Sequence, residues 1–146
     1  MSERSPPGRR ADYKHFHPMP TRWMDNDVYG HVNNVTFLSY ADTAVNRYLI
    51  DVGKLDFHSD PVIGIMVETM CRFHKSIAYP DLIECGLRIG RLGSSSVRYE
   101  VGMFVAPDDV ARAEAHCVHV FVERATNKPV PIPDKIRTAL ARIQRS

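Results

Sequence analysis

The stretch that decides the fold is NNVTFLSYADTAVNRYLIDVG, residues 33–53. An Asn at its start can cap a helix, and Gly53 suits the position just after a helix end. Apolar side chains recur along it at helical spacing and form one stripe. The stripe consists of Phe37, Ala41, Ala44, Val45, Tyr48, Leu49 and Val52. A long helix of this kind needs a broad apolar surface to pack against.

The residues after Pro61 change to alternation with period two, which predicts β-strands. Turn residues separate four such segments, at about residues 63–73, 83–89, 97–105 and 111–123. In the first segment the alternation places one set of side chains on a single face. This set is Ile63, Ile65, Val67, Thr69, Cys71 and Phe73. A further strand fits within residues 13–24, before the helix.

The four strands follow one another through short connections, which predicts antiparallel pairing because parallel neighbours need longer crossovers. The predicted fold class is therefore α+β, with the long helix packed on one face of an antiparallel sheet. A short terminal helix is expected to begin at Pro133 and Asp134. Because such a sheet has edges that must be covered or paired, self-association is also expected.

Length and charge limit the remaining possibilities. A chain of 146 residues favours one domain, spanning residues 1–146, over two. The net charge of +2 gives no indication of a nucleic-acid partner. Arg9, Arg10 and Lys14 form the densest basic group, in a segment with Pro and Gly. Residues 1–12 are therefore expected to be a flexible N-terminal extension.

The cysteines and the apolar runs indicate a cytoplasmic protein that does not enter a membrane. Cys71, Cys85 and Cys117 form no CxxC pair, so neither a disulfide framework nor a zinc site is expected. The longest apolar run, residues 62–67, is too short to span a bilayer. The N-terminus lacks the apolar core of a secretory signal. His116 and His119 are expected on opposite faces of a strand, which argues against a shared metal.

The most unusual segment is RWMDNDVYGHVNN, residues 22–34, between the first predicted strand and the helix. It combines carboxylates, an imidazole and amides at the start of a helix, where unpaired N–H groups can bind an oxyanion. A nearby carboxylate could attack a carbonyl or take a proton from water. Taken singly, the same residues also suit helix capping and a turn.

Four pieces of the sequence, in order, resemble the hotdog-fold acyl-CoA thioesterases of the 4-hydroxybenzoyl-CoA thioesterase type. The first is DVYGHVNNVTF, residues 27–37, followed by Tyr40-Ala41-Asp42. The others are FHKSIAYPD at 73–81, RLGSSSV at 91–97 and KPVPIP at 128–133. The resemblance therefore extends over about residues 13–133, nearly the whole domain.

The resemblance implies a hotdog fold, in which a sheet of five or six strands wraps around one long central helix. It implies that two subunits join their sheets edge to edge, as a homodimer or a dimer of dimers, with active sites at the interface. Asp27 matches the catalytic acid, and the backbone N–H of Asn34 matches the group that polarises the thioester carbonyl. His31 matches the histidine of the His-Val-Asn-Asn variant in acyl-carrier-protein thioesterases, so the resemblance places it with Asp27 and Asn34 among the catalytic residues.

The resemblance also implies an acyl-CoA substrate and no metal or other cofactor. Tyr29, Asp42, Arg91 and Ser94 are the expected substrate-binding residues. Many relatives carry Glu where this chain has the shorter Asp42. Asp42 could therefore serve catalysis or be an ordinary polar residue on the helix. Arg91 and Ser94 could contact the phosphates of coenzyme A or belong to a solvated hairpin.

Two other functions stay open from the sequence. One is a hydratase or dehydratase of the same fold, although the Asp-x-Asn-Pro-x-His pattern of such enzymes is absent. The other is a non-catalytic module that binds acyl-CoA, in which Asp27 would have no role. Release of thiol from an acyl-CoA by the protein separates these alternatives.

Overall fold

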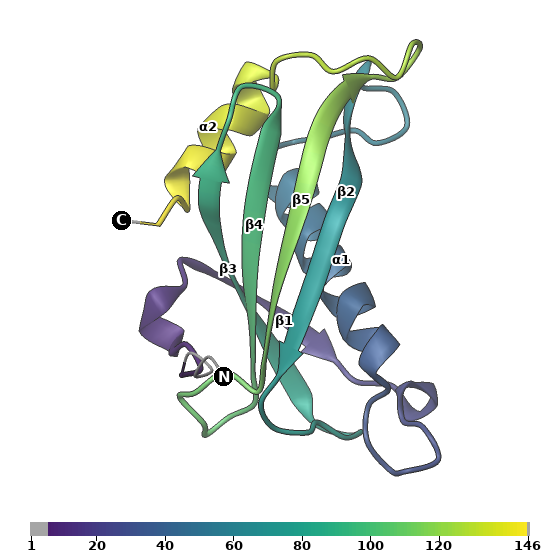
Figure 1. The fold of residues 1–146 in the computed structure, drawn as a ribbon, viewed down its shortest axis with the longest axis vertical. Coiled ribbons are helices and arrows are strands. Elements are labelled where there is room, and N and C mark those ends of the chain that lie inside the picture. The colour runs from purple at the N-terminus through teal and green to yellow at the C-terminus, as the bar shows by residue number, and fades with distance from the viewer. Residues whose placement is uncertain (1–5, 146) are drawn as a thin grey trace, which may run out of the picture.

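The computed structural model describes residues 6–145 of the chain. Its elements run β1 (His15–Pro20), α1 (Asn34–Asp51), β2 (Val62–Phe73), β3 (Leu82–Leu92), β4 (Ser96–Phe104), β5 (Ala113–Glu123) and α2 (Asp134–Arg142). Two short 3₁₀ helices, η1 (Arg10–Asp12) and η2 (Trp23–Asp25), flank β1 in the sequence. The predicted long helix, the four predicted strands, the additional strand and the terminal helix are all confirmed (Figure 1).

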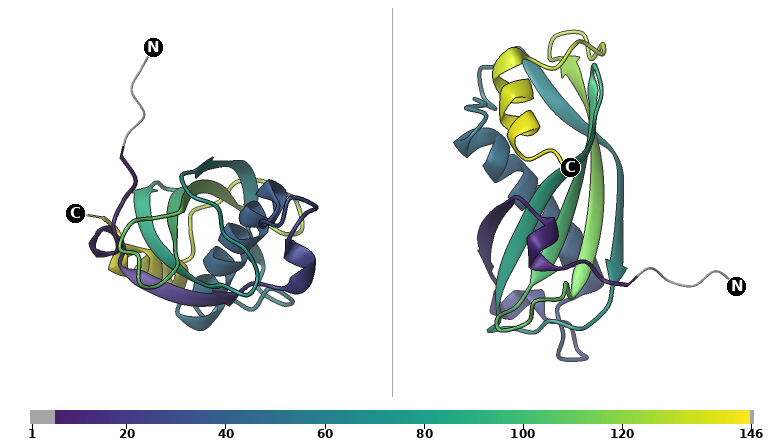
Figure 2. Two further views of the ribbon diagram at one scale, coloured as in Figure 1. Left: turned by 90° about the horizontal axis from the view of Figure 1, so that it is seen from below. Right: turned by 90° about the vertical axis from the view of Figure 1, so that its left-hand side faces the viewer.

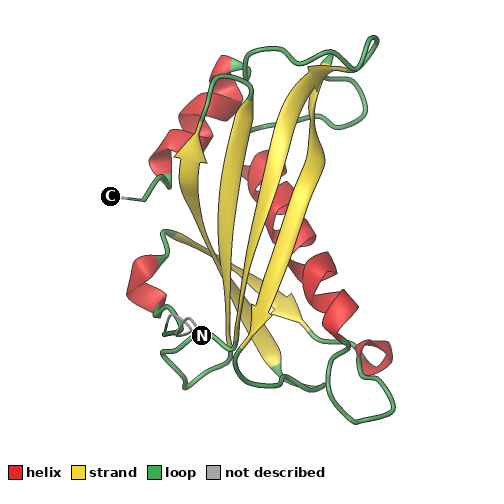
Figure 3. Cartoon of the chain, in the orientation of Figure 1, coloured by secondary structure: helices red, strands yellow, loops and turns green. Residues whose placement is uncertain are grey.

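The strands form one sheet in the order β1-β3-β4-β5-β2, and every neighbouring pair is antiparallel. Both helices lie on the same face of this sheet, which curves around α1 (Figures 2 and 3). The fold class predicted from the sequence, α+β with an antiparallel sheet around one long helix, is confirmed with five strands. Because β1 and β2 lie at the two ends of the order, they are the edges of the sheet.

The core forms where the apolar stripe of α1 meets the inner face of the sheet. The buried side chains of α1 are Phe37, Tyr40, Ala41, Ala44, Val45, Tyr48 and Leu49. They match the predicted stripe except that Val52, which caps the helix, is only half-buried and Tyr40 is added. Each large apolar side chain buried in this way contributes roughly 1.5–3 kcal/mol to folding. Packing rather than helix propensity therefore holds α1 in place.

The prediction that alternate residues from Ile63 to Phe73 share one face is wrong. The register of β2 against β5 shifts between Met66 and Glu68, so that Val67 forms a bulge. Before the bulge, Val62 and Met66 pack against the core, and after it Cys71 and Phe73 do so. An extra residue reverses which side chains face inward, and a period-two pattern cannot show this reversal.

The described part of the N-terminal segment, before β1, contacts the rest of the domain. Residues 1–5 of the predicted extension lie outside the described residues. Beyond them, the Ala111 N–H donates to the Gly8 carbonyl at 2.9 Å. Arg10 forms an ion pair with Glu84 at 2.9 Å, and its guanidinium lies 5.1 Å from the centre of the Phe104 ring. The described part of the extension is therefore held on the surface by polar contacts.

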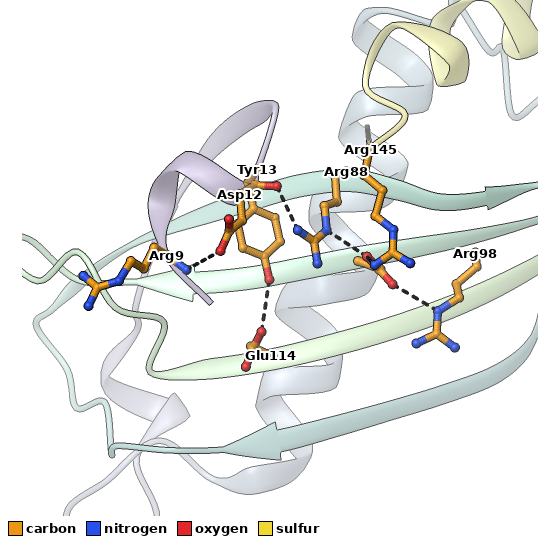
Figure 4. Close-up of polar contacts among 8 residues, drawn as sticks. Arg9, Asp12, Tyr13, Arg88, Arg98, Glu114 and Arg145 are labelled. Carbon is orange, nitrogen blue, oxygen red and sulfur yellow. Dashed lines mark hydrogen bonds and ion pairs between the residues drawn. The ribbon is translucent and has the colours of Figure 1, made fainter. Parts of the chain in front are cut away.

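A second polar cluster covers the outer face of the sheet, away from both helices (Figure 4). Its centre is Glu100 on β4, whose side chain is 13% exposed. Arg88 approaches this carboxylate at 2.8 Å, Arg98 at 3.3 Å and Arg145 at 3.4 Å. Burial raises the pKa of Glu100, but the bonds and charges of these arginines outweigh burial and hold the pKa below its usual range. Through Arg145, this cluster links the chain after α2 to the outer face of the sheet, where the Arg145 N–H also donates to the Ile89 carbonyl at 2.9 Å.

Candidate active site

The segment between η2 and α1 folds back on itself as a small hairpin. At its base the Asn33 N–H donates to the Asp25 carbonyl at 2.9 Å, and further out the Asp27 N–H donates to the His31 carbonyl at 2.9 Å. A turn closes the hairpin, with the Gly30 N–H donating to the Asp27 carbonyl at 3.0 Å. Gly30 has a φ of 84°, which glycine adopts without steric cost. The backbone thus places Asp27 at the start of a tight turn.

The Asp27 carboxylate is oriented by its own turn. Its Oδ1 accepts a hydrogen bond from the Tyr29 N–H at 2.9 Å. Within residues 6–145, the other oxygen, Oδ2, has no hydrogen-bond donor. Asp27 is half-buried, whereas the Tyr29 side chain beside it is 84% exposed. One carboxylate oxygen is therefore held while the other stays available to a substrate or a water molecule.

At the start of α1, the N–H group of Asn34 has no acceptor among residues 6–145. Asn33 is the N-cap, and its Oδ1 accepts from the Val35 N–H at 2.9 Å. The Asn33 carbonyl accepts from the Thr36 N–H, also at 2.9 Å. In the described part of the chain, no group accepts from the Asn34 N–H between them. This donor carries part of the positive end of the helix dipole and is suited to a developing oxyanion.

Asp27 and Asn34 lie on the same groove, whose volume is about 600 Å³. The hairpin and the first turn of α1 form one wall, and the chain after β2 forms the other. The lining residues are Asp27, Tyr29, His31, Val32, Asn33, Asn34, Phe37, Phe73, His74, Lys75 and Ser76. The Phe37 and Phe73 rings meet edge to face, with centres 5.1 Å apart, and provide an apolar surface.

A smaller hollow of about 260 Å³ adjoins this groove and shares Asn34 and Phe73 with it. It lies between the first turns of α1 and the edge strand β2. Its other lining residues are Val35, Leu38, Thr69, Met70 and Cys71. Burial raises the pKa of the Cys71 thiol to about 11, so this side chain is neutral near pH 7. The hollow is therefore a mainly apolar continuation of the groove.

The base of the hairpin contains a buried carboxylate, that of Asp25, which is 2% exposed. Burial raises its pKa, but hydrogen bonds from Tyr40 and Arg22 outweigh burial and hold the pKa below its ordinary value. The same burial, together with the Asp25 charge, raises the pKa of the Tyr40 hydroxyl. Asp25 is therefore a carboxylate and Tyr40 a hydrogen-bond donor at neutral pH.

Sequence reasoning did not single out the second wall of the groove, residues 73–76, as functional. His74 there bonds through Nε2 to the Glu114 carboxylate at 2.8 Å, and Lys75 pairs with Asp108 at 3.5 Å. These residues follow a strand that is distant in sequence from Asp27. Residues 73–81 carry part of the family resemblance, but their place in the groove depends on the packing of β2 beside α1, which a local pattern does not show.

The predicted site residues divide into two groups in the structure. Asp27, Asn34, Tyr29 and His31 line the groove together. Asp42 lies outside it, exposed on α1, where its Oδ1 accepts from the Asn46 amide at 3.1 Å.

Arg91 and Ser94 lie at the far end of the sheet, around the β3–β4 turn next to α2 (Figure 1). There the Ser94 carbonyl accepts from the Ile132 N–H at 2.9 Å and from Arg137 at 3.1 Å. One chain therefore does not bring these two residues to Asp27.

Known structures share this architecture. The PA5185 protein of Pseudomonas aeruginosa strain PAO1 is 50% identical to the chain, with a TM-score of 0.95 over 97% of this chain and 99% of that one. The PA2801 protein, a predicted thioesterase from Pseudomonas aeruginosa, is 32% identical, with a TM-score of 0.80 over 86% and 96%. A 1,4-dihydroxy-2-naphthoyl-CoA thioesterase from Synechocystis is 18% identical, with a TM-score of 0.78 over 86% and 94%, and so shares the fold. No curated protein sequence matches the chain.

The five-stranded sheet around α1 and the helix-start groove define a hotdog-fold protein. Residues 21–140 match the model of the thioesterase-like superfamily. The chain belongs to this family and is a thioester hydrolase. The resemblance noted from the sequence is thereby confirmed at the level of the family. Among residues 6–145, no helix is long and apolar enough to cross a membrane.

Proposed function

We propose that the chain hydrolyses an acyl-CoA thioester to the free acid and coenzyme A, with Asp27 as the catalytic carboxylate. The observation that supports this most is the groove that holds both the Asp27 carboxylate and the acceptor-free Asn34 N–H. These are the two groups that acyl transfer requires, a base or nucleophile and an oxyanion donor. Two proteins of the same fold are CoA thioesterases by name, that of Synechocystis and the gentisyl-coenzyme A thioesterase BH1999.

Asn34 acts on the carbonyl oxygen in this proposal. As the carbonyl carbon becomes tetrahedral, negative charge develops on that oxygen, and the Asn34 N–H is a preorganised donor to it. The donor already lacks a protein acceptor, so no existing bond within the described residues must break when the substrate binds. The partial positive charge at the start of α1 adds to the stabilisation.

Asp27 can act in two ways that give the same products. As nucleophile, its Oδ2 attacks the carbonyl carbon, the C–S bond breaks, and the thiolate leaves and takes a proton. Water then cleaves the mixed anhydride to the free acid and restores Asp27. As general base, Asp27 removes a proton from a water molecule that attacks directly. A single turnover in ¹⁸O water distinguishes these routes, because only the first can place ¹⁸O in Asp27.

Tyr29 is proposed to bind the substrate and His31 to take part in catalysis with Asp27, because both line the groove next to Asp27. The apolar hollow beside Phe73 has room for part of an acyl group, and the open groove leads the coenzyme A portion to solvent. Asp42, Arg91 and Ser94 lie away from the groove within one chain. Their proposed binding role therefore depends on a second copy of the chain.

A homodimer that pairs along β2 is proposed for this reason. The strand is an edge, spans twelve residues, and exposes residues 67–70 beside the apolar hollow. In a two-fold, antiparallel pairing of β2 with its copy, the Val62 end of one strand meets the Phe73 end of the other. The β3–β4 turn of one copy then lies at the same end of the joined sheet as the groove of the other. A dimer of dimers and a cytoplasmic location are proposed along with this.

The test is the release of free thiol from a panel of acyl-CoA substrates with short, long and aromatic acyl groups. The Asp27→Asn variant should lose this activity by about a thousandfold or more, because Asn is neither a base nor a nucleophile here. The Asp51→Asn variant makes the same change at an exposed site on α1 and should keep full activity. If Asp27→Asn retains most of the wild-type rate, Asp27 is not the catalytic group.

The same panel tests the alternatives left open by the sequence. A wild-type protein that binds acyl-CoA but releases no thiol from any substrate would be a binding module. A hydrated acyl-CoA product would identify a hydratase instead. Either result would overturn the proposed function.

A further inference from the structure

Asp25 makes more polar contacts than any step of the proposed reaction explains. Its Oδ2 accepts from the Tyr40 hydroxyl at 2.6 Å and from the Arg22 N–H at 2.8 Å. Its Oδ1 accepts from Arg22 Nε at 3.1 Å and from the second guanidinium nitrogen at 2.9 Å. Both Asp25 and Tyr40 are almost fully buried, so neither can contact a substrate in the groove directly.

The contacts join the two parts of the site. Tyr40 lies on α1, whose first residue is Asn34, and Asp25 lies at the base of the hairpin that contains Asp27. The Asp25 carbonyl also accepts from the Asn33 N–H, the N-cap of the same helix. The side chain of Asp25 therefore binds to Tyr40 of α1, and its backbone carbonyl binds to the N-cap of the same helix.

The outer part of the hairpin has no comparable support. The Val28 and Tyr29 side chains are 96% and 84% exposed, and among the described residues the Asp27 carboxylate is bonded only within its own turn. Two other bonds hold the hairpin, from the Val32 N–H to the Ile77 carbonyl at 2.7 Å and from the Tyr79 N–H to Asn26 at 3.0 Å. Both lead to the chain after β2, so they do not set the distance from the hairpin to α1.

We propose that Asp25, held by the Tyr40 hydroxyl, is a positioning residue that sets the Asp27 carboxylate relative to the Asn34 N–H. The inference rests on the proposed function, because the distance between these two groups matters only if both act on the same thioester. Without the Tyr40 bond the hairpin stays folded through its contacts with residues 77 and 79, but it can shift against α1. Acyl transfer is sensitive to such a shift, because a displacement of about 1 Å can cost about a hundredfold in rate.

The test compares two Tyr→Phe variants on the same helix. Tyr40→Phe removes the bond to Asp25, and Tyr48→Phe removes an equally buried bond, from the Tyr48 hydroxyl to the Ala139 carbonyl of α2 at 2.5 Å. Both should lower the melting temperature by similar amounts. Tyr40→Phe should lower kcat by about tenfold or more with KM within about twofold of wild type, whereas Tyr48→Phe should leave kcat unchanged.

Asp25→Asn supplies a second variant, since Asn keeps the shape but is a weaker acceptor for the Tyr40 and Arg22 donors. It should lower kcat at least as much as Tyr40→Phe, and the double variant should lose little more than Asp25→Asn alone. Two results would overturn the inference: a kcat for Tyr40→Phe close to that of wild type, or an equal loss in Tyr48→Phe.

The result for Asp27→Asn separates the two proposals. If that variant loses activity while Tyr40→Phe keeps it, the positioning role fails and the proposed function stands. If Asp27→Asn keeps its activity, the proposed function fails and the positioning role fails with it.

Discussion

The imidazole of His119 should make the protein lose stability in mild acid. His119 lies on β5 with its side chain turned into the core, and it is 2% exposed. Its ring lies against Gly64, where an added Cβ would stand 2.7 Å from Nδ1, and its centre is 5.0 Å from that of the Tyr99 ring. Nδ1 has no hydrogen-bond partner in the described structure. A second proton on this ring would therefore create a buried positive charge that no hydrogen bond from Nδ1 compensates.

Burial lowers the pKa of His119 from 6.5 to about 4. In the unfolded chain the ring takes up a proton below about pH 6.5, whereas in the folded protein it stays neutral until about pH 4. The unfolded state thus binds more protons between these values, so the free energy of unfolding falls as the pH falls through this window. The loss attributable to His119 amounts to about 2.5 kcal/mol between about pH 7.5 and pH 4.5.

Urea denaturation at a series of pH values measures this effect, with His119→Phe as the matched variant. Phenylalanine fills a similar volume next to Tyr99 and Phe121 and cannot be protonated. Carboxylates titrate in both proteins and cancel in the comparison. The wild type should therefore lose about 2.5 kcal/mol more than His119→Phe over this range. Parallel curves of unfolding free energy against pH for the two proteins would refute the reasoning.

Two further predictions concern the outer face and the edge of the sheet. Glu100→Gln should lower the free energy of unfolding, measured by urea denaturation, by about 2 kcal/mol, because three arginines lose their charged partner. The control Glu123→Gln, at an exposed position, should have little effect. Sedimentation equilibrium should show the mass of a dimer. In thermal unfolding, the melting temperature should rise with protein concentration, because higher concentration favours the folded dimer by mass action. A monomer at all concentrations, with a constant melting temperature, would contradict pairing along β2.

Most of the fold was predictable because its elements are long and strongly periodic. The helix was expected from Asn33 to Gly53, and α1 spans Asn34–Asp51 with Val52 as its C-cap. The pairing direction followed from the short connections between strands. The inward face of β2 was not predictable, because one bulged residue at Val67 reverses the alternation. A bulge depends on the partner strand, which local spacing does not describe.

The candidate site was predictable where its residues are close in sequence. Asp27, His31 and Asn34 belong to one segment at a helix start, and the groove includes all three. The wall at residues 73–76 was missed because it enters the site through tertiary packing. Asp25 belongs to the same segment, but the sequence does not show its role, because its bond to Tyr40 spans fifteen positions and depends on how the hairpin folds back on α1.

The two edges of the sheet differ in a way that limits how many copies can join through strand pairing. The edge strand β1 has six residues and contains Pro18 and Pro20, whereas β2 at the opposite edge has twelve and contains no proline. Short strands and prolines are features that protect a sheet against further pairing. When two copies pair along β2 about a two-fold axis, the β2 edge of each copy is occupied. The outer edges of the joined sheet are then the two β1 strands, which are protected. Association through strands therefore closes at two copies, whereas a chain with two adhesive edges would extend into an open-ended fibre.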